Sequence, residues 1–377
     1  MKLIMQELFA QKPGPQLVIV ALVAGLLAAC AGEKPTAAPA LNPVDAHALI
    51  EQALPRYVTD RAGWTTDIYS AFTVLTVTPS RENVCAVVAV IEQESSFRTD
   101  PKIPGLGVIA RKEIAARAER AHVPMLLVDG VLQLKSADGR TYGERIDVAK
   151  TEKDLSDAYE DFIASVPLGR TLFADKNPIR TRGPMQVNVS FAEQFAAAAP
   201  YPYPVKTSIA DELFTRRGSV YFGTAHLLNY RAPYDNYLYR FADFNAGQYA
   251  SRNAAFQNAA AIASGVSLIP DGALLPHDGD ANKPGDTEAA LRALGARLKQ
   301  SEGAIHAALA EGKTKGFEKT TLYQRVFALA DQTAGSELPR ALVPRIQLGG
   351  PKIKRKLTTD WYAHRVDDRF KRCLAAK

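Results

Sequence analysis

The feature that most constrains the fold is a run of eight residues, Val84 to Ile91, whose apolar side chains would cover every face of a helix. Ser80 can cap this helix, and Glu82 suits the positive end of its dipole. A helix that is apolar all round is stable only when other elements surround it. The sequence therefore predicts a central buried helix over 82–96, ending near Glu94.

Glu94, at the end of this helix, is the candidate catalytic residue. A carboxyl group at the edge of a core is partly desolvated, which raises its pKa and keeps it protonated. A protonated carboxyl group can donate its proton to a glycosidic oxygen. Glu92 lies about 200° round the helix from Glu94, so the two carboxyl groups are not an acid–nucleophile pair.

The rest of the chain is predicted to be mainly α, because apolar residues recur with the period of a helix. Its hydrophobic content of 47% and charged content of 23% are ordinary for a globular protein. The expected helices are 45–54, 64–77, 82–96, 106–121, 151–165, 189–199, 208–230, 235–243, 248–264, 286–309, 318–332 and 358–374.

A small β element is predicted to interrupt this helical pattern. Met125–Val128 and Val131–Leu134 flank Asp129-Gly130, a residue pair typical of two-residue hairpin turns. Asp138-Gly139 indicates a second turn shortly afterwards. We therefore expect a β-hairpin over 125–134.

The N-terminus predicts export and lipidation. An apolar run from Leu17 to Ala29 follows two lysines and is too short to span a bilayer comfortably. It ends in Leu27-Ala28-Ala29-Cys30, which resembles a bacterial lipobox. We expect a signal peptide over 1–29, lipidated Cys30, a Pro/Ala-rich tether over 30–43 and a globular body over 44–377. A short membrane anchor with an incidental cysteine is the alternative.

The other two cysteines, Cys85 and Cys373, form an even pair in an oxidising compartment and predict a disulfide. Two separately buried thiols are the alternative. The cysteine and histidine spacing does not favour structural zinc. The net charge of +6 becomes about +5 once the leader, with its two lysines and one glutamate, is removed. This mild basic excess suits an acidic polymer as partner.

Four short motifs, in this order, resemble those of lytic transglycosylases of the lysozyme-like superfamily. They are Gln93-Glu94-Ser95-Ser96-Phe97, Gly183-Pro184-Met185-Gln186, Asp243-Phe244-Asn245-Ala246-Gly247 and Lys319-Thr320-Thr321-Leu322-Tyr323. The whole chain also resembles uncharacterised Gram-negative lipoproteins of a family of unknown function. The first resemblance implies a lysozyme-like fold, no cofactor, no metal and no nucleic acid. Its partner would be the glycan strands of peptidoglycan, met from an outer-membrane anchor facing the periplasm.

The same resemblance implies a role for each matching residue. Glu94 would act alone, first as acid and then as base, and Tyr323 would hydrogen-bond to it. The product would be a 1,6-anhydro-muramyl end, formed without water. The residues that would contact the substrate are Ser95, Met185, Gln186 and Asn245.

Departures from the family pattern leave other functions open. Pro184 and Lys319 replace the usual leucine and glutamate, and Glu94 and Gln186 lie 92 positions apart. The insertion responsible, 98–180, could form a lid or subdomain over the glycan groove. Asp243 could be a second acid that restores hydrolysis, or could cap a helix or face solvent. The competing functions are a non-catalytic peptidoglycan-binding or scaffolding lipoprotein and a hydrolase of chitin-like glycan.

Three further features favour structural interpretations. Asp278, Asp280 and Asn282 have calcium-loop spacing but lack the glycine and glutamate of that motif, which indicates a solvated loop. His226 lies in an apolar helix and is expected to be a core histidine. Tyr230, Tyr234, Tyr237 and Phe241 recur at helical spacing and are expected in the core.

Overall fold

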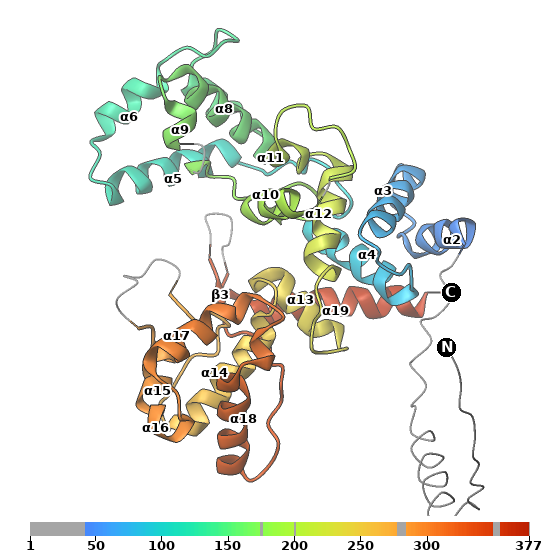
Figure 1. Ribbon diagram of the computed structural model, residues 1–377. Coiled ribbons are helices and arrows are strands. Elements are labelled where there is room, and N and C mark those ends of the chain that lie inside the picture. Colours follow the sequence, from blue (N-terminus) through green and yellow to red (C-terminus); the bar gives the residue numbers. More distant parts are fainter. Residues whose placement is uncertain (1–41, 174–175, 200, 277–283, 350–354, 377) are drawn as a thin grey trace, which may run out of the picture. The chain divides into compact units, whose positions relative to one another are not determined.

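The structure is a computed structural model that describes residues 42–173, 176–199, 201–276, 284–349 and 355–376 (Figure 1). Within these residues the fold is mainly helical, with two small antiparallel hairpins. Cys30 and residues 1–41 of the expected leader and tether lie outside them, as do Asp278, Asp280 and Asn282. Among the described helices, none combines the length and the apolar character that a bilayer span requires.

The predicted central helix is α4 (Arg81–Ser95), and its burial confirms the prediction. Ser80 accepts a hydrogen bond from the Asn83 amide at 3.2 Å, and every residue from Val84 to Ile91 is buried. Three helices pack against it: α2 (Pro43–Ala53), α12 (Arg216–Leu228) and α19 (Thr359–Ala375).

The first hydrophobic core forms round α4. Further members come from α3 (Arg61–Val74), α10 (Val189–Ala198), α11 (Ile209–Glu212) and α13 (Tyr237–Ala246). The predicted helix over 208–230 is therefore two helices, because Thr215 caps the start of α12 through the Gly218 amide.

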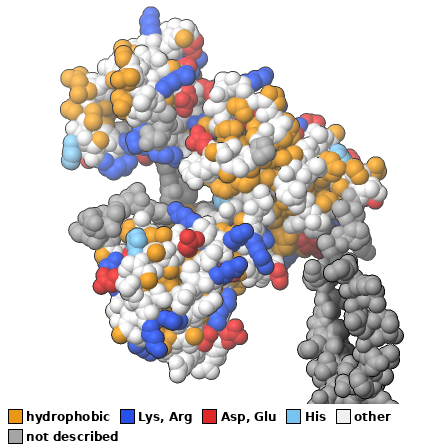
Figure 2. All heavy atoms as spheres, viewed as in Figure 1, with side chains coloured by type: hydrophobic (Ala, Val, Ile, Leu, Met, Phe, Trp, Pro, Cys, Tyr) orange, Lys and Arg blue, Asp and Glu red, His pale blue; other side chains and the backbone are white. Residues whose placement is uncertain are grey.

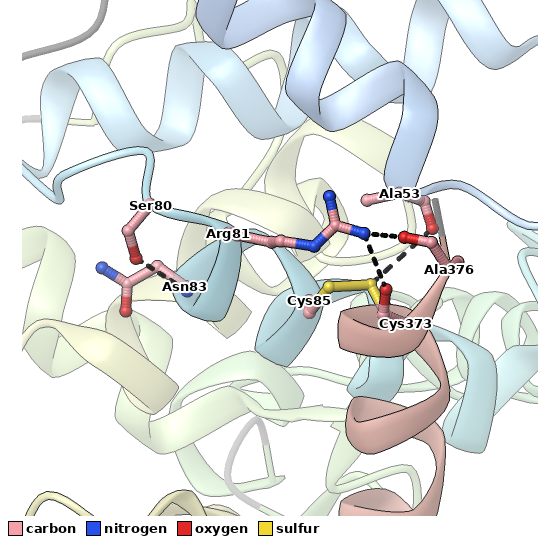
Figure 3. The surroundings of a disulfide bond; sticks show 7 residues. All are labelled: Ala53, Ser80, Arg81, Asn83, Cys85, Cys373 and Ala376. Carbon is pink, nitrogen blue, oxygen red and sulfur yellow. Dashed lines mark hydrogen bonds between the residues drawn. A yellow bond between two sulfur atoms is a disulfide. The ribbon is translucent and has the colours of Figure 1, made fainter.

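A disulfide joins α4 to the C-terminal helix α19, as predicted. Cys85 and Cys373 are bonded with their Cα atoms 5.5 Å apart, across a sequence separation of 288 residues (Figure 3). Arg81 donates hydrogen bonds to the carbonyl oxygens of Cys373 and Ala376 at the same end of the helix. The alternative of two separate thiols is wrong.

A second hydrophobic core lies in the C-terminal half of the chain. It contains aromatic residues Phe256, Phe317, Tyr323 and Phe327, packed within one cluster. Its members come from α14 (Ala250–Ser264), α15 (Asp286–Ala293), α16 (Gly295–Leu298), α17 (Glu302–Ala310), η4 (Phe317–Lys319) and α18 (Thr321–Ala334), and η3 (Glu311–Lys313) follows α17.

The described residues of the predicted insertion form five helices, which direct apolar side chains towards one another. These insertion helices are α5 (Leu106–Arg120), α6 (Met125–Leu132), α7 (Tyr142–Val148), α8 (Glu152–Ser165) and α9 (Gly169–Phe173). No described residue of 98–180 belongs to either of the two hydrophobic cores.

The hairpin predicted over 125–134 is wrong, because this segment forms helix α6. Asp129 and Gly130 lie inside the helix, which begins directly after Pro124. Short apolar runs fit helical and extended patterns equally well, and here packing with α5 and α7 selects the helix. The second turn is confirmed: Gly139 has φ +84°, and an isolated antiparallel bridge joins Lys135 to Thr141.

The two observed hairpins lie elsewhere. β1 (Thr181–Arg182) pairs with β2 (Val187–Asn188) and encloses the Gly183–Gln186 motif. β3 (Gln347–Leu348) pairs with β4 (Leu357–Thr358) and leads into α19. These strands are two residues long, too short for a periodic pattern to reveal.

Candidate functional site

The chain turns sharply immediately after Glu94. Ser96 and Phe97 both have positive φ, at 50° and 60°, a conformation that is uncommon for non-glycine residues. The buried Phe97 ring fixes the turn by an edge contact with Trp64, with ring centroids 5.1 Å apart. Glu94 therefore lies at the last turn of a rigid helix rather than on a loop.

The Glu94 carboxyl group is partly desolvated and is hydrogen-bonded to a tyrosine of α19. The residue is half-buried, and the Tyr362 hydroxyl donates to Glu94 Oε1 at 2.5 Å. Burial raises the pKa of Glu94 to about 7, while the Tyr362 hydrogen bond and the charge of Arg369 act in the opposite direction. A carboxyl group with this pKa is partly protonated at neutral pH, as general acid catalysis requires.

Helix α19 also contacts Asn245, the third motif. Thr359 donates from Oγ1 to Asn245 Oδ1 at 2.7 Å. Thr359 and Tyr362 are three residues apart, so they lie on the same face of α19. One helix face thus holds both Glu94 and Asn245.

Arg369, seven residues after Tyr362 in α19, interacts with a second carboxylate, that of Glu92. Its charge acts on Glu94, Glu92 and the half-exposed Tyr57, whose pKa is raised by burial and by the Glu92 carboxylate. Burial lowers the pKa of Arg369 itself, and its Nε has no hydrogen-bond partner among the described residues.

The Gly183–Gln186 motif is a tight hairpin loop. Gly183 has φ +73°, and a Cβ atom there would lie 1.9 Å from the Leu213 carbonyl oxygen, so only glycine fits. Met185 is fully buried, donates its amide to Ser219 Oγ at 2.9 Å and packs against Gly223. The expectation that Met185 contacts the substrate is therefore wrong, because its side chain is fully buried and supports the loop from inside.

Gln186 connects this loop to the insertion. Its Nε2 donates to Glu152 at 3.0 Å, and its Oε1 accepts from Thr181 at 2.9 Å. The side chain is thus oriented by α8 and β1 together.

Two residues expected at the site have other partners. Ser95 is buried and donates from Oγ to the Ile91 carbonyl, one turn earlier in α4, at 3.1 Å. Tyr323 was expected to hydrogen-bond to Glu94, and this prediction is wrong. Tyr323 lies in the second hydrophobic core, stacked on Phe256 with ring centroids 5.7 Å apart, and Tyr362 takes the expected position.

Asp243 is a structural carboxylate. It is fully buried and accepts from the hydroxyls of Tyr230 (2.8 Å) and Tyr234 and from the amides of Tyr249 (3.1 Å) and Ser251 (2.7 Å). The expected capping role is therefore met at the start of α14, and the solvent-facing alternative is wrong. Tyr230 and Tyr234 precede α13, so the helical interpretation of the four aromatic residues holds for Tyr237 and Phe241 alone.

His226 is a neutral histidine inside an aromatic cluster. Its ring centroid lies 4.4 Å from that of Phe191 and 5.1 Å from that of Phe244. Burial lowers its pKa to about 4, so it stays uncharged at neutral pH. This agrees with the predicted core histidine.

Comparison with known proteins gives a family but no activity. A family model described as "Protein of unknown function (DUF1615)" matches residues 57–376. The "Uncharacterized protein YaiW" of Escherichia coli (strain K12) is 49% identical over 331 residues, which cover 88% of this chain and 90% of that protein. No solved structure matches.

Proposed function

The chain belongs to the DUF1615 family, and we propose that it is a lytic transglycosylase that cleaves the MurNAc–GlcNAc bond of peptidoglycan. The observation that carries the proposal is Glu94, a carboxyl group with a pKa of about 7 at the end of the central helix. Its place in the first of four ordered motifs supports the same activity. The expected membership in a family of unknown function is confirmed, whereas the activity and the lysozyme-like fold are proposals.

The reaction would use Glu94 twice. The protonated carboxyl group donates to the glycosidic oxygen, and the bond between this oxygen and C1 of the muramic sugar breaks. The acetamido group of the sugar stabilises the positive charge that develops. Glu94, now a carboxylate, takes the proton of the C6 hydroxyl, whose oxygen bonds to C1. The product is a 1,6-anhydro sugar, and no water is consumed.

The surroundings of Glu94 support this one-carboxylate scheme. A two-carboxylate hydrolase needs a second acid that is free to hold water or attack the sugar. Asp243 is unsuitable, because four protein donors occupy its oxygens. Tyr362 and Arg369 would stabilise the carboxylate that forms after the first proton transfer.

We propose that the enzyme is located at the inner face of the outer membrane. Cys30 would carry the lipid, and the Pro/Ala-rich tether would let the body reach glycan strands. The net charge of about +5 on the mature chain suits this acidic polymer.

A specific observation favours a second candidate, a non-catalytic lipoprotein that binds peptidoglycan or scaffolds envelope proteins. Three polar side chains expected to contact substrate are already hydrogen-bonded within the protein. They are Ser95, Gln186 and Asn245. A site whose polar groups are satisfied internally gains less from a sugar ligand.

Incubation with purified sacculi separates the two candidates. The wild-type protein is expected to release soluble fragments, and Glu94→Gln is expected to release none. Glu82→Gln is the matched control, because it removes an exposed carboxyl group at the opposite end of α4, and it should retain activity. Cosedimentation without release by wild type would favour the binding protein, and neither binding nor release would refute both.

A further inference from the structure

We propose that the insertion helices form a half-open binding site for one acyl chain carrying an anionic head group. This inference is independent of the proposed transglycosylase activity. It starts from a cavity of about 930 Å³ among α5, α6, α7 and α8, with Ile179 and Arg180 at its β1 side. That volume is at the upper end of the roughly 300–1,000 Å³ typical of small-molecule sites.

The wall of the cavity is made mostly of aliphatic and aromatic side chains. Its members include Ile109, Ile114, Leu127, Leu155, Phe162 and Ile179. The cavity is about half open to solvent, so these helices leave exposed to water apolar side chains that a close-packed core would bury. Water is a poor occupant of such a space, because it finds few hydrogen-bond partners there. A flexible hydrocarbon chain can pack against the same apolar side chains and needs no hydrogen-bond partner.

An extended peptide fits this wall less well. Peptides bound as added strands or in grooves depend on hydrogen bonds to their main chain. Apart from its charged groups, the polar side chains of the lining are Tyr142, Tyr159 and Thr181. The chemistry of the wall therefore favours an acyl chain.

Cations at the lining supply the complement for an anionic head group. Arg117, Lys176 and Arg180 line the cavity, together with the two carboxylates Glu113 and Glu152. The Arg117 guanidinium is already paired with Glu113 at 2.7 Å. Arg180 is exposed, and its side chain belongs to no salt bridge between described residues. A carboxylate or phosphate would gain charge-assisted hydrogen bonds from this guanidinium.

Helix α6 provides a way in. Leu127 lines the cavity and is nevertheless 61% exposed, and its neighbour Leu126 is 82% exposed. Figure 2 shows hydrophobic side chains gathered on the surface where α6 lies. An amphiphile could therefore pass from an apolar surface into the cavity with little exposure to water.

Photolabelling tests the site on the full chain, reconstituted in phosphatidylcholine vesicles. The probe is a photoactivatable palmitic acid, and labelled peptides are mapped by mass spectrometry. Labels are expected inside the cavity, on α5 and α8. Ala110→Trp, which places a large ring in the cavity, should reduce them by about tenfold. Ala116→Trp, on another face of the same helix, is the matched control and should leave labelling unchanged. Ala158→Trp fills the cavity from α8 and repeats the test.

The charge of the head group is tested separately. Arg180→Glu should reduce labelling by about tenfold, whereas Arg170→Glu, outside the cavity, should not. A photoactivatable palmityl alcohol should label at least about tenfold less than the acid. Equal labelling by acid and alcohol would overturn the anionic head group. Labelling confined to the outside of α6 and insensitive to Ala110→Trp and Ala158→Trp would show membrane contact only, and absence of labelling would refute the site.

Discussion

The pKa of Glu94 makes the stability of the protein depend on pH in a way that one substitution should remove. Burial raises this pKa from 4.5 to about 7, so the folded protein binds more protons than the unfolded chain between these values. The free energy of unfolding therefore contains a contribution that is fully present below pH 4.5 and is lost as pH rises through 7. At 1.36 kcal/mol per pKa unit, that loss is about 3 kcal/mol.

Glu94→Gln replaces the titrating group with a neutral side chain that can still accept from Tyr362. Urea unfolding of both proteins from about pH 4 to about pH 8 isolates the effect, since all other groups titrate alike. The stability of the variant relative to wild type should increase by about 3 kcal/mol across this range. Glu82→Gln, at the exposed opposite end of α4, is the control. A difference between Glu94→Gln and wild type that does not change with pH would refute the reasoning.

Substitutions at three further residues test other parts of the account. Tyr362→Phe removes a hydrogen bond that lowers the pKa of Glu94. The pH at which the free energy of unfolding falls should therefore be higher in this variant than in wild type. An unchanged midpoint of this pH dependence would contradict the prediction. Cys373→Ser should lower the free energy of unfolding by about 2–4 kcal/mol in urea titrations, whereas equal stability with and without the disulfide would contradict this. Asp243→Ala leaves two tyrosine hydroxyls and two amides without their acceptor and should cost about 3 kcal/mol or more. Asp243→Asn should cost less, and similar thermal unfolding of all three proteins would argue against the role of Asp243.

Much of the helical fold could be predicted because its signals are local. The apolar run from Val84 to Ile91 identifies a buried helix, and Ser80 identifies its start. Segment 125–134 lacked such a signal, because its apolar residues fit either period and its Asp-Gly pair favoured a turn. Packing against α5 and α7 decided that segment, and packing is not local.

The partner of Glu94 was missed for a different reason. Tyr362 lies 268 residues away, and no motif spacing points to it. The predicted disulfide offered a usable signal. From Cys85 to Glu94 a helix rises about 14 Å, and from Cys373 back to Tyr362 about 16 Å. Antiparallel helices joined at the cysteines would therefore bring Tyr362, on the same helix face as Cys373, level with Glu94. Glu94 lies about 180° round α4 from Cys85, so the disulfide indicates the height of Tyr362 along α4 but not the face on which Glu94 lies.

Digestion of sacculi in heavy-oxygen water tests the central claim most directly, because the proposed reaction consumes no water. Mass spectrometry of the muropeptides should find 1,6-anhydro ends that contain no heavy oxygen. These ends are lighter by one water than the reducing ends that hydrolysis would produce. The anhydro ends should be absent with Glu94→Gln. Reducing ends that carry heavy oxygen at C1 would show hydrolysis and contradict the account of Glu94 as the sole acid and base.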